Sequence, residues 1–268
     1  MEYKSYESDS LALNPQSPFF LDHVTRYWWA SARCKGKSVL DCASGKGYGS
    51  YILSQNAEKV LGVDLNDNSL ELASRIFGNK ENLNYQKRDV FKLKEKNEKF
   101  DVITAFEVIE HIEPSETDEF ISSLASALNE NGELLLSTPN HDVVLKSRSS
   151  VPSFHINNFR AHELKASLEK HFHNVEMIGQ YRRRGALYNT VFSLDFFNFR
   201  HSLRNIFKAP SAVEQMSEDT PDQEEFIAQN PLNIDDFSNS PKEFSEYEFS
   251  SKHWRQAGLS VCICSNPK

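Results

Sequence analysis

The chain alternates short apolar strands with helical segments, and this alternation restricts its fold more than any other feature. Predicted strands cover residues 37–42, 59–64, 83–89, 100–106 and 133–137. They are apolar almost throughout, which indicates burial on both faces, as in a parallel sheet whose crossover connections are helices. The sequence therefore predicts an α/β fold in which helices cover both faces of a mostly parallel sheet.

Two later apolar segments, 175–179 and 259–265, bring the predicted sheet to seven strands, and a long insertion separates them. The first half of the insertion, 187–207, has apolar residues at helical spacing and predicts an aromatic helix. The second half is acidic and rich in Pro, Ser and Asn, which is typical of a mobile or irregular segment. The predicted domains are an N-terminal cap region at 1–36, the α/β domain at 37–180 and 256–268, and the insertion at 181–255.

The charge balance bears on the partners of the chain. Thirty-eight acidic and 30 basic residues give a net charge of −8, and an acidic chain is not attracted as a whole to nucleic acid or anionic lipid. The chain opens with polar residues instead of a secretory signal, and no apolar run approaches the roughly 20 residues that span a bilayer. We therefore expect a cytoplasmic protein without a transmembrane segment and without nucleic acid as its main partner.

A glycine-rich turn follows the first strand directly, in the run VLDCASGKGYG at residues 39–49. Glycines let the backbone approach a ligand where a Cβ atom would clash, and the helix that follows presents unpaired N–H groups. The G-x-G-x-G spacing differs from the G-x-G-x-x-G spacing of NAD enzymes. Alone, the motif also fits a tight turn that binds nothing.

Two carboxylates make the turn more specific, because Asp64 ends the second strand and Asp89 ends the third. Carboxyl ends of parallel strands meet at one edge, where open α/β sheets bind ligands. An acidic side chain after the second strand can accept hydrogen bonds from both ribose hydroxyls of a nucleoside, and Asp89 can meet an adenine amino group. Either residue alone would more often cap a helix or be solvated, but the three features in register predict a nucleoside site.

Together with FDVITAFEVIEHI and GELLLSTPN, these motifs resemble the class I S-adenosylmethionine-dependent methyltransferases, over about residues 20–180 and the last strand. The resemblance implies a Rossmann-like sheet whose last strand is antiparallel, and S-adenosylmethionine as cofactor. Ala43 stands where the family usually has its first glycine. The implied contacts are Asp41, Ala43, Gly45 and Gly47 at the methionine half, Asp64 with Leu65 at the ribose, Asp89 and Val90 at the adenine, Phe106 beside the sulfonium, and Arg26 and Tyr27 from the N-terminal helix over the cofactor.

A second group of residues points to the acceptor. Glu107, Glu110 and His111 stand at i, i+3 and i+4, which places them on one face of a helical turn, and His155 lies in a later loop. Two carboxylates and two imidazoles predict a site for Mg²⁺ or Mn²⁺ with positions open to substrate oxygens. Without a metal, His155 or His111 becomes the general base, and Glu107 beside the sulfonium completes the predicted catalytic set. The glutamates could also be structural, with His111 capping the turn.

The strings GKGYGS, STPN and FHINNF resemble methyltransferases of bacterial surface-polysaccharide gene clusters. We therefore expect an enzyme that O-methylates a sugar in a glycan or in a lipid-linked or phosphorylated glycan precursor. The pattern E-x-x-E-H with a later His is similar to that of metal-dependent RNA 2′-O-methyltransferases, so RNA is one alternative. A non-catalytic cofactor-binding protein is the other. The aromatic helix could cover the acceptor site, form a homodimer contact or face lipid.

Overall fold

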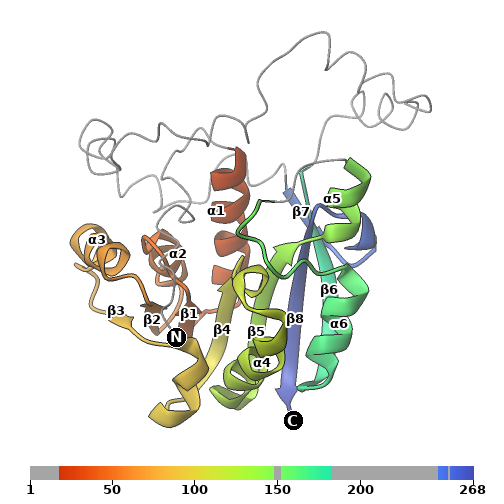
Figure 1. Cartoon of the computed structure of the whole chain (residues 1–268). Helices are drawn as coiled ribbons and strands as arrows, with labels where there is room; N and C mark the ends of the chain where they lie inside the picture. The colour runs from red at the N-terminus through yellow and green to blue at the C-terminus, as the bar shows by residue number, and fades with distance from the viewer. Residues whose placement is uncertain (1–17, 148–151, 183–246, 253) are drawn as a thin grey trace. The chain divides into compact units, whose positions relative to one another are not determined.

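The computed structural model of the chain describes residues 18–147, 152–182, 247–252 and 254–268. Its strands form one eight-stranded sheet in the order β3-β2-β1-β4-β5-β8-β6-β7 (Figure 1). The strands are β1 Ser38–Cys42, β2 Lys59–Asp64, β3 Leu83–Lys87, β4 Phe100–Phe106, β5 Leu128–Pro139, β6 Phe172–Arg182, β7 Tyr247–Ser250 and β8 Leu259–Pro267. The α-helices are α1 Pro18–Ser31, α2 Tyr48–Leu53, α3 Asp67–Phe77, α4 Thr117–Ser126, α5 His141–Ser147 and α6 Ala161–Glu169. Short 3₁₀ helices are η1 Val90–Lys96, η2 Ile109–His111, η3 Pro114–Glu116 and η6 Trp254–Gln256.

The first five strands are parallel, and β8 runs antiparallel to both β5 and β6. The predicted Rossmann-like sheet, mostly parallel with an antiparallel last strand, is therefore confirmed. The structure adds strand β7 at the edge, within the predicted insertion 181–255. With four residues after a long acidic stretch, β7 is too short to show a clear apolar pattern. The predicted helix at 187–207 lies outside the described residues, and the predicted domain boundaries stay predictions.

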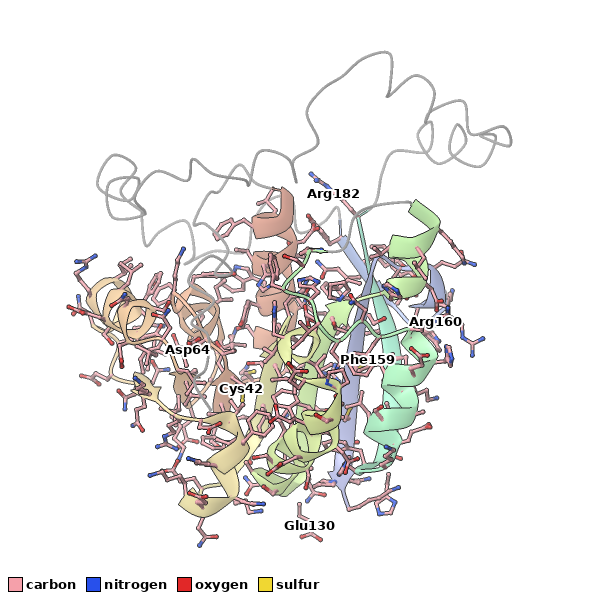
Figure 2. The ribbon with its side chains drawn as sticks, in the orientation of Figure 1. Cys42, Asp64, Glu130, Phe159, Arg160 and Arg182 are labelled. Atoms are coloured by element: carbon pink, nitrogen blue, oxygen red, sulfur yellow. The ribbon has the colours of Figure 1, made fainter. Side chains whose placement is uncertain are left out.

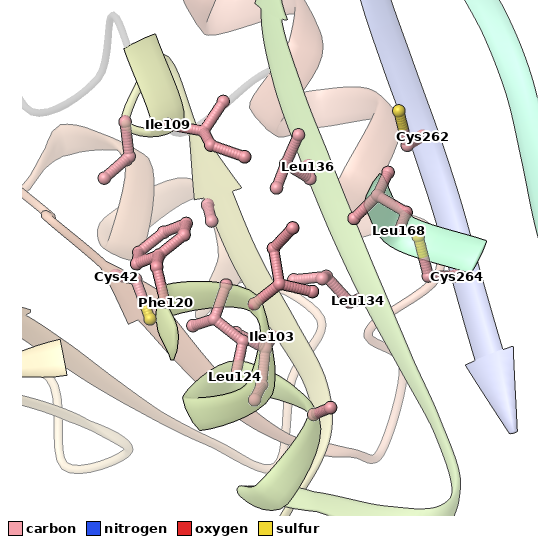
Figure 3. Packing of buried hydrophobic residues seen from close by; sticks show 14 of the residues in the cluster. Cys42, Ile103, Ile109, Phe120, Leu124, Leu134, Leu136, Leu168, Cys262 and Cys264 are labelled. Carbon is pink, nitrogen blue, oxygen red and sulfur yellow. The ribbon is translucent and has the colours of Figure 1, made fainter. Parts of the chain in front are cut away.

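Helices cover both faces of this sheet, as the apolar strands require. On one face, α4 and α6 pack on alternate residues of β4, β5 and β8 (Figure 3). The labelled members of this cluster include Ile103, Phe120, Leu124, Leu134, Leu136, Leu168, Cys262 and Cys264. On the other face, α1 packs against α2, and Tyr51 of α2 stacks on Phe77 of α3 with ring centroids 5.0 Å apart. Among the described residues, no helix combines the length and apolar character that crossing a membrane requires.

The carboxyl ends of the parallel strands form one edge, and the register brings their last residues together. Asp41 of β1 pairs with Gly62 of β2 on one side and with Thr104 of β4 on the other. Figure 2 shows Asp64 toward this edge and Glu130 at the opposite one. The residues predicted to bind the ligand therefore follow neighbouring strands at the same end of the sheet.

Candidate active site

The loop between β1 and α2 has a backbone that few side chains tolerate. Ala43, Gly45 and Gly47 all have positive φ angles, of 53°, 50° and 84°. Hydrogen bonds hold the loop against β2, because Ser44 N donates to Val63 O over 2.9 Å and Gly45 N donates to Asp64 Oδ2 over 2.8 Å. Ala43 is exposed and Gly45 is half-buried, so the loop offers open backbone at the edge of the sheet where a ligand can approach closely.

Gly47 is the tightest position of this loop. A Cβ atom there would lie 2.5 Å from Ala73 Cβ and 2.7 Å from Tyr85 Oη, in a backbone conformation with positive φ. We expect Gly47→Ala to lower the free energy of unfolding by about 2–4 kcal/mol, from left-handed strain and overpacking together. Gly45→Ala is the matched control, because its φ is also positive but nothing lies within 4 Å of its Cβ position. Urea denaturation of both variants checks this, and equal losses would contradict it.

Asp41 is fully buried, and protein donors satisfy its carboxylate. Oδ1 accepts from Thr104 Oγ1 at 2.6 Å and from Tyr27 OH at 3.1 Å, and Oδ2 accepts from Ser50 Oγ at 2.6 Å. Burial raises the pKa of Asp41 to about 6, although the three hydrogen bonds lower it in part. The Asp41 side chain thus ties β1 to α1, α2 and β4 beneath the glycine-rich loop.

This burial predicts a specific pH dependence of stability. Because the folded-state pKa of Asp41, about 6, exceeds the ordinary value of 3.8, its contribution is fully present below pH 3.8 and is lost as the pH rises through 6. The interval corresponds to about 3 kcal/mol. We expect the stability of the native protein relative to Asp41→Asn to fall by about that amount between pH 4 and pH 7.5. Chemical denaturation gives the unfolding free energy of both proteins at both pH values. If the difference between the two proteins is the same at pH 4 and pH 7.5, the pKa of Asp41 is not raised by folding.

The two predicted nucleoside carboxylates differ in how they are held. Asp64 accepts from Gly45 N at 2.8 Å and from Asn66 N at 2.9 Å, so it joins the glycine-rich loop to the start of α3. Leu65 beside it is 38% exposed, which is unusual for a leucine in this fold. Asp89 instead caps η1, because its Oδ1 accepts from Phe91 N at 3.0 Å, and Val90 beside it is half-buried.

Arg26 and Tyr27 of α1 lie over the tips of β1 and β4, but both are buried. The Tyr27 ring meets the Phe106 ring edge-on, with centroids 5.1 Å apart, and covers Gly49 so closely that no Cβ would fit there. The Arg26 guanidinium is 2% exposed and donates to protein groups: Gln180 Oε1 at 3.0 Å, Ser137 Oγ at 3.1 Å and Glu107 Oε1 at 3.3 Å. The Arg26 guanidinium is thus held by an internal network in this structure, and its predicted cofactor contact stays a prediction.

Glu107 directly follows β4 and has a left-handed backbone, with φ at 56°. Its amide donates to Ser137 O at 3.0 Å, and its Oε1 accepts from Ser137 Oγ at 2.8 Å as well as from Arg26. Such a conformation costs a non-glycine residue about 1–3 kcal/mol and persists only where its surroundings hold it. Ser137 and Arg26 supply that hold and direct Glu107 toward α1.

The other three predicted metal ligands come together. Glu110, His111 and His155 each offer one ligand atom, and these atoms lie within 4.8 Å of one another. Glu110 is 1% exposed; its Oε2 accepts from Thr138 Oγ1 at 2.9 Å, whereas Oε1 has no hydrogen-bond partner among the described residues. The His111 and His155 rings meet edge-on at 5.1 Å, and Phe154 stacks on His111 at 5.8 Å.

Burial changes the protonation of this cluster. It raises the pKa of Glu110 well above the ordinary value, and the nearby charge of Glu107 raises it further. Burial, with a smaller contribution from the charge of His111, lowers the pKa of His155 to about 4. His155 is therefore a neutral imidazole at neutral pH, which is the form that binds metal ions.

Sequence reasoning missed several residues that organise this site, namely Ser50, Thr104, Ser137, Thr138, Phe154 and Gln180. Thr104 is a polar residue inside the apolar strand FDVITAF, and a polar residue at a buried strand position indicates a buried hydrogen bond. Gln180 and Ser137 gave no signal, because their role depends on Arg26, more than 100 positions away.

The comparisons with known proteins agree with this geometry. A methyltransferase-domain family matches residues 18–177, which include α1, the glycine-rich loop and the Glu110–His111 turn. The chain belongs to this methyltransferase family. The predicted class I S-adenosylmethionine-dependent methyltransferase is thereby confirmed at the level of family and fold.

Proteins with similar sequences are also named as methyltransferases. The methyltransferase domain is 27% identical over 165 residues to a probable S-adenosylmethionine-dependent methyltransferase of Mycolicibacterium smegmatis, covering 61% of this chain and 62% of that protein. It is 32% identical over 109 residues to the ubiquinone biosynthesis O-methyltransferase of Coxiella burnetii, covering 40% of this chain and 46% of that protein. The chain thus spans about half of the length of these relatives.

Solved structures share the fold. A Pyrococcus horikoshii protein superposes with a TM-score of 0.54 at 19% identity, covering 69% of this chain and 95% of that one. The N-methyltransferase NodS of Bradyrhizobium japonicum, solved with S-adenosyl-L-homocysteine, superposes with a TM-score of 0.51 at 14% identity, covering 64% of this chain and 84% of that one. At these identities the likeness concerns the fold alone.

Proposed function

We propose that this protein transfers a methyl group from S-adenosylmethionine to a hydroxyl oxygen. The observation that carries the proposal is the open glycine-rich loop tied to Asp64, with the exposed Leu65 beside it. Oxygen as acceptor is supported by the Coxiella burnetii relative, which is named as an O-methyltransferase.

The cofactor would lie along the edge from β1 to β3. The backbone at Ala43, Gly45 and Gly47 would face its methionine half, with Asp41 positioning the loop from below. Asp64 would accept from the ribose hydroxyls, because a carboxylate already aimed at N–H donors can also accept from a diol. Leu65 would lie beside the ribose and Val90 beside the adenine. The second oxygen of Asp89 lies 3.9 Å from Lys92 Nζ and would accept from the adenine amino group.

The cluster of Glu110, His111 and His155 fits a divalent cation such as Mg²⁺ or Mn²⁺. The buried Glu110 Oε1, without a partner among the described residues, is the kind of atom that a cation satisfies. The two imidazoles favour Mn²⁺ over Mg²⁺, which prefers oxygen ligands, and three protein ligands leave coordination positions for substrate oxygens. Glu107 is outside the cluster in this structure, so we propose three protein ligands where the sequence suggested four.

Methyl transfer to a hydroxyl forms a carbon–oxygen bond as the carbon–sulfur bond breaks, leaving the electron pair on sulfur and releasing the hydroxyl proton. The cofactor supplies the activated methyl group, and a bound cation would lower the pKa of an oxygen that it holds. The protein aligns the acceptor. A base with a pKa of about 4 is poorly matched to neutral pH, so we favour His155 as a ligand over His155 as the general base.

We propose a sugar as the acceptor, in a glycan or a lipid-linked or phosphorylated precursor. A cation with open positions could bind two adjacent hydroxyls, which sugars provide, and Phe154 offers an aromatic ring beside it. RNA also carries adjacent hydroxyls at its 3′ end, but a net charge of −8 disfavours a polyanion.

Two experiments test the proposal. Calorimetry with S-adenosylmethionine and S-adenosylhomocysteine should show binding of both, and binding of neither would overturn the assignment. Turnover with tritiated methyl donor should then be measured on purified glycans and on RNA, with and without EDTA. We expect glycan methylation that EDTA abolishes and Mn²⁺ restores. If only RNA is methylated, RNA is the acceptor and not a sugar. If the protein binds S-adenosylmethionine but methylates neither glycans nor RNA, a non-catalytic protein is favoured.

A further inference from the structure

Glu107 and Arg26 form a part-buried ion pair at the tip of β4, the strand next to the one that leads into the glycine-rich loop. Glu107 follows Phe106 at the tip of β4, and β4 is the strand next to β1 and its glycine-rich loop. The guanidinium nitrogen Nη1 lies 3.3 Å from Glu107 Oε1. Removing Glu107 would leave the buried charge of Arg26 uncompensated, so the pair is a fixed part of the site.

The two charges of this pair are not equally accessible. The Arg26 side chain is 2% exposed, whereas that of Glu107 is 21% exposed. Arg26 and Ser137 both bind the same oxygen, Oε1. The pair therefore presents its carboxylate, the negative end of a dipole, to the accessible side, with the Arg26 charge behind it.

We propose that Glu107, held by Arg26 and Ser137, determines how strongly the site prefers the sulfonium of S-adenosylmethionine over the neutral thioether of S-adenosylhomocysteine. This inference rests on the proposed function and on the sulfonium position that the family resemblance implies, beside Phe106, the residue before Glu107. A carboxylate stabilises a nearby cation and does little for a neutral sulfur. The pair thus selects the methyl donor over the product, and Arg26 acts as a positioning residue that holds the Glu107 carboxylate in place.

The test compares two ligands that differ only in one methyl group and one charge. Calorimetry gives the Kd of each, and any general distortion of the site weakens both, so the ratio of the two values reports the field at the sulfur. We expect Glu107→Gln to raise the Kd of S-adenosylmethionine relative to that of S-adenosylhomocysteine by about tenfold, a value between those for charges in bulk water and near a protein surface. Glu107→Asp, which keeps the charge, should leave the ratio within about threefold of the native value.

Glu133→Gln is the matched control. Glu133 is 24% exposed, close to the 21% of Glu107, and it pairs with Arg33 at 3.4 Å and with Lys37 at 3.9 Å, but it lies further back along β5. In Glu133→Gln, the ratio of the Kd of S-adenosylmethionine to that of S-adenosylhomocysteine should not change. If the uncompensated Arg26 unfolds Glu107→Gln, the double variant Arg26→Met/Glu107→Gln removes both charges, and its ratio should still rise by at least about threefold.

The outcomes separate this inference from the proposed function. A native protein that binds neither ligand would overturn both. A native protein that binds both ligands, with an unchanged ratio in Glu107→Gln or in the double variant, would overturn the role of Glu107 alone. A ratio that rises equally in Glu133→Gln would show that net charge, rather than this pair, sets the preference.

Discussion

Asp64→Ala is expected to weaken the binding of S-adenosylhomocysteine by about 100-fold. The Asp64 carboxylate would accept two hydrogen bonds from the ribose, and charge-assisted hydrogen bonds contribute about 1.5–3 kcal/mol each. A total of about 3 kcal/mol corresponds to two orders of magnitude in Kd. The same substitution releases Gly45 N, which Asp64 holds at 2.8 Å, and so loosens the loop that faces the methionine half. Calorimetry measures the loss directly.

Asp67→Ala provides the control for this substitution. Asp67 lies three residues further on, in the first turn of α3, and its exposed side chain pairs with Lys87. The variant removes the same charge near the same edge, but we expect less than a twofold change in Kd, because exposed ion pairs contribute little. Equal losses in both variants would mean that net charge, not a ribose contact, explains the Asp64 result.

His155→Ala is expected to reduce turnover by at least about 10–100-fold, the loss typical even of residues that only support a metal ligand, while the Kd of S-adenosylhomocysteine stays within about twofold. His155 belongs to the cluster with Glu110 and His111, and none of these three residues is among those proposed to hold the cofactor. Removing one ligand of three should also weaken Mn²⁺ binding, which electron paramagnetic resonance detects without any acceptor. Turnover on the glycan that the native protein methylates completes the measurement.

The control for this variant is His171→Ala. His171 pairs with the exposed Asp118 on the surface and contacts none of the three residues in the cluster. It should keep native turnover and native Mn²⁺ affinity. Normal turnover in His155→Ala would remove His155 from the mechanism. Lost turnover with unchanged Mn²⁺ affinity would make it a base and not a ligand.

Local pattern was sufficient to predict the sheet and the glycine-rich loop, because both depend on residues near each other in the chain. The predicted face shared by Glu107, Glu110 and His111 shows where this reasoning stops. The i, i+3, i+4 rule assumes one continuous helix, but η2 begins only at Ile109 and Glu107 has a left-handed backbone. Hence Glu107 turns toward Arg26, while Glu110 and His111 keep their common neighbour His155.

Asp89 shows a second limit. Its position at the end of the third strand suggested a ligand contact, yet one of its oxygens caps η1. Cap and ligand contact use the same residue type at the same place, so sequence position alone does not separate them. The hydrogen bond from Arg26 to Gln180 could not be predicted either, because the two residues approach each other only in the completed sheet.

The position of β8 has a consequence for how this protein is made. β8 is the last described strand in the chain but lies between β5 and β6, each of which forms its ladder of backbone hydrogen bonds with β8. While a ribosome is still adding residues 259–267, the facing sides of β5 and β6 have no strand to pair with, and such open edges favour aggregation. A nascent chain that lacks β8 would therefore expose both edges, and Ser137 and Gln180, the partners of Arg26, would reach their final places only after β8 has paired with β5 and β6.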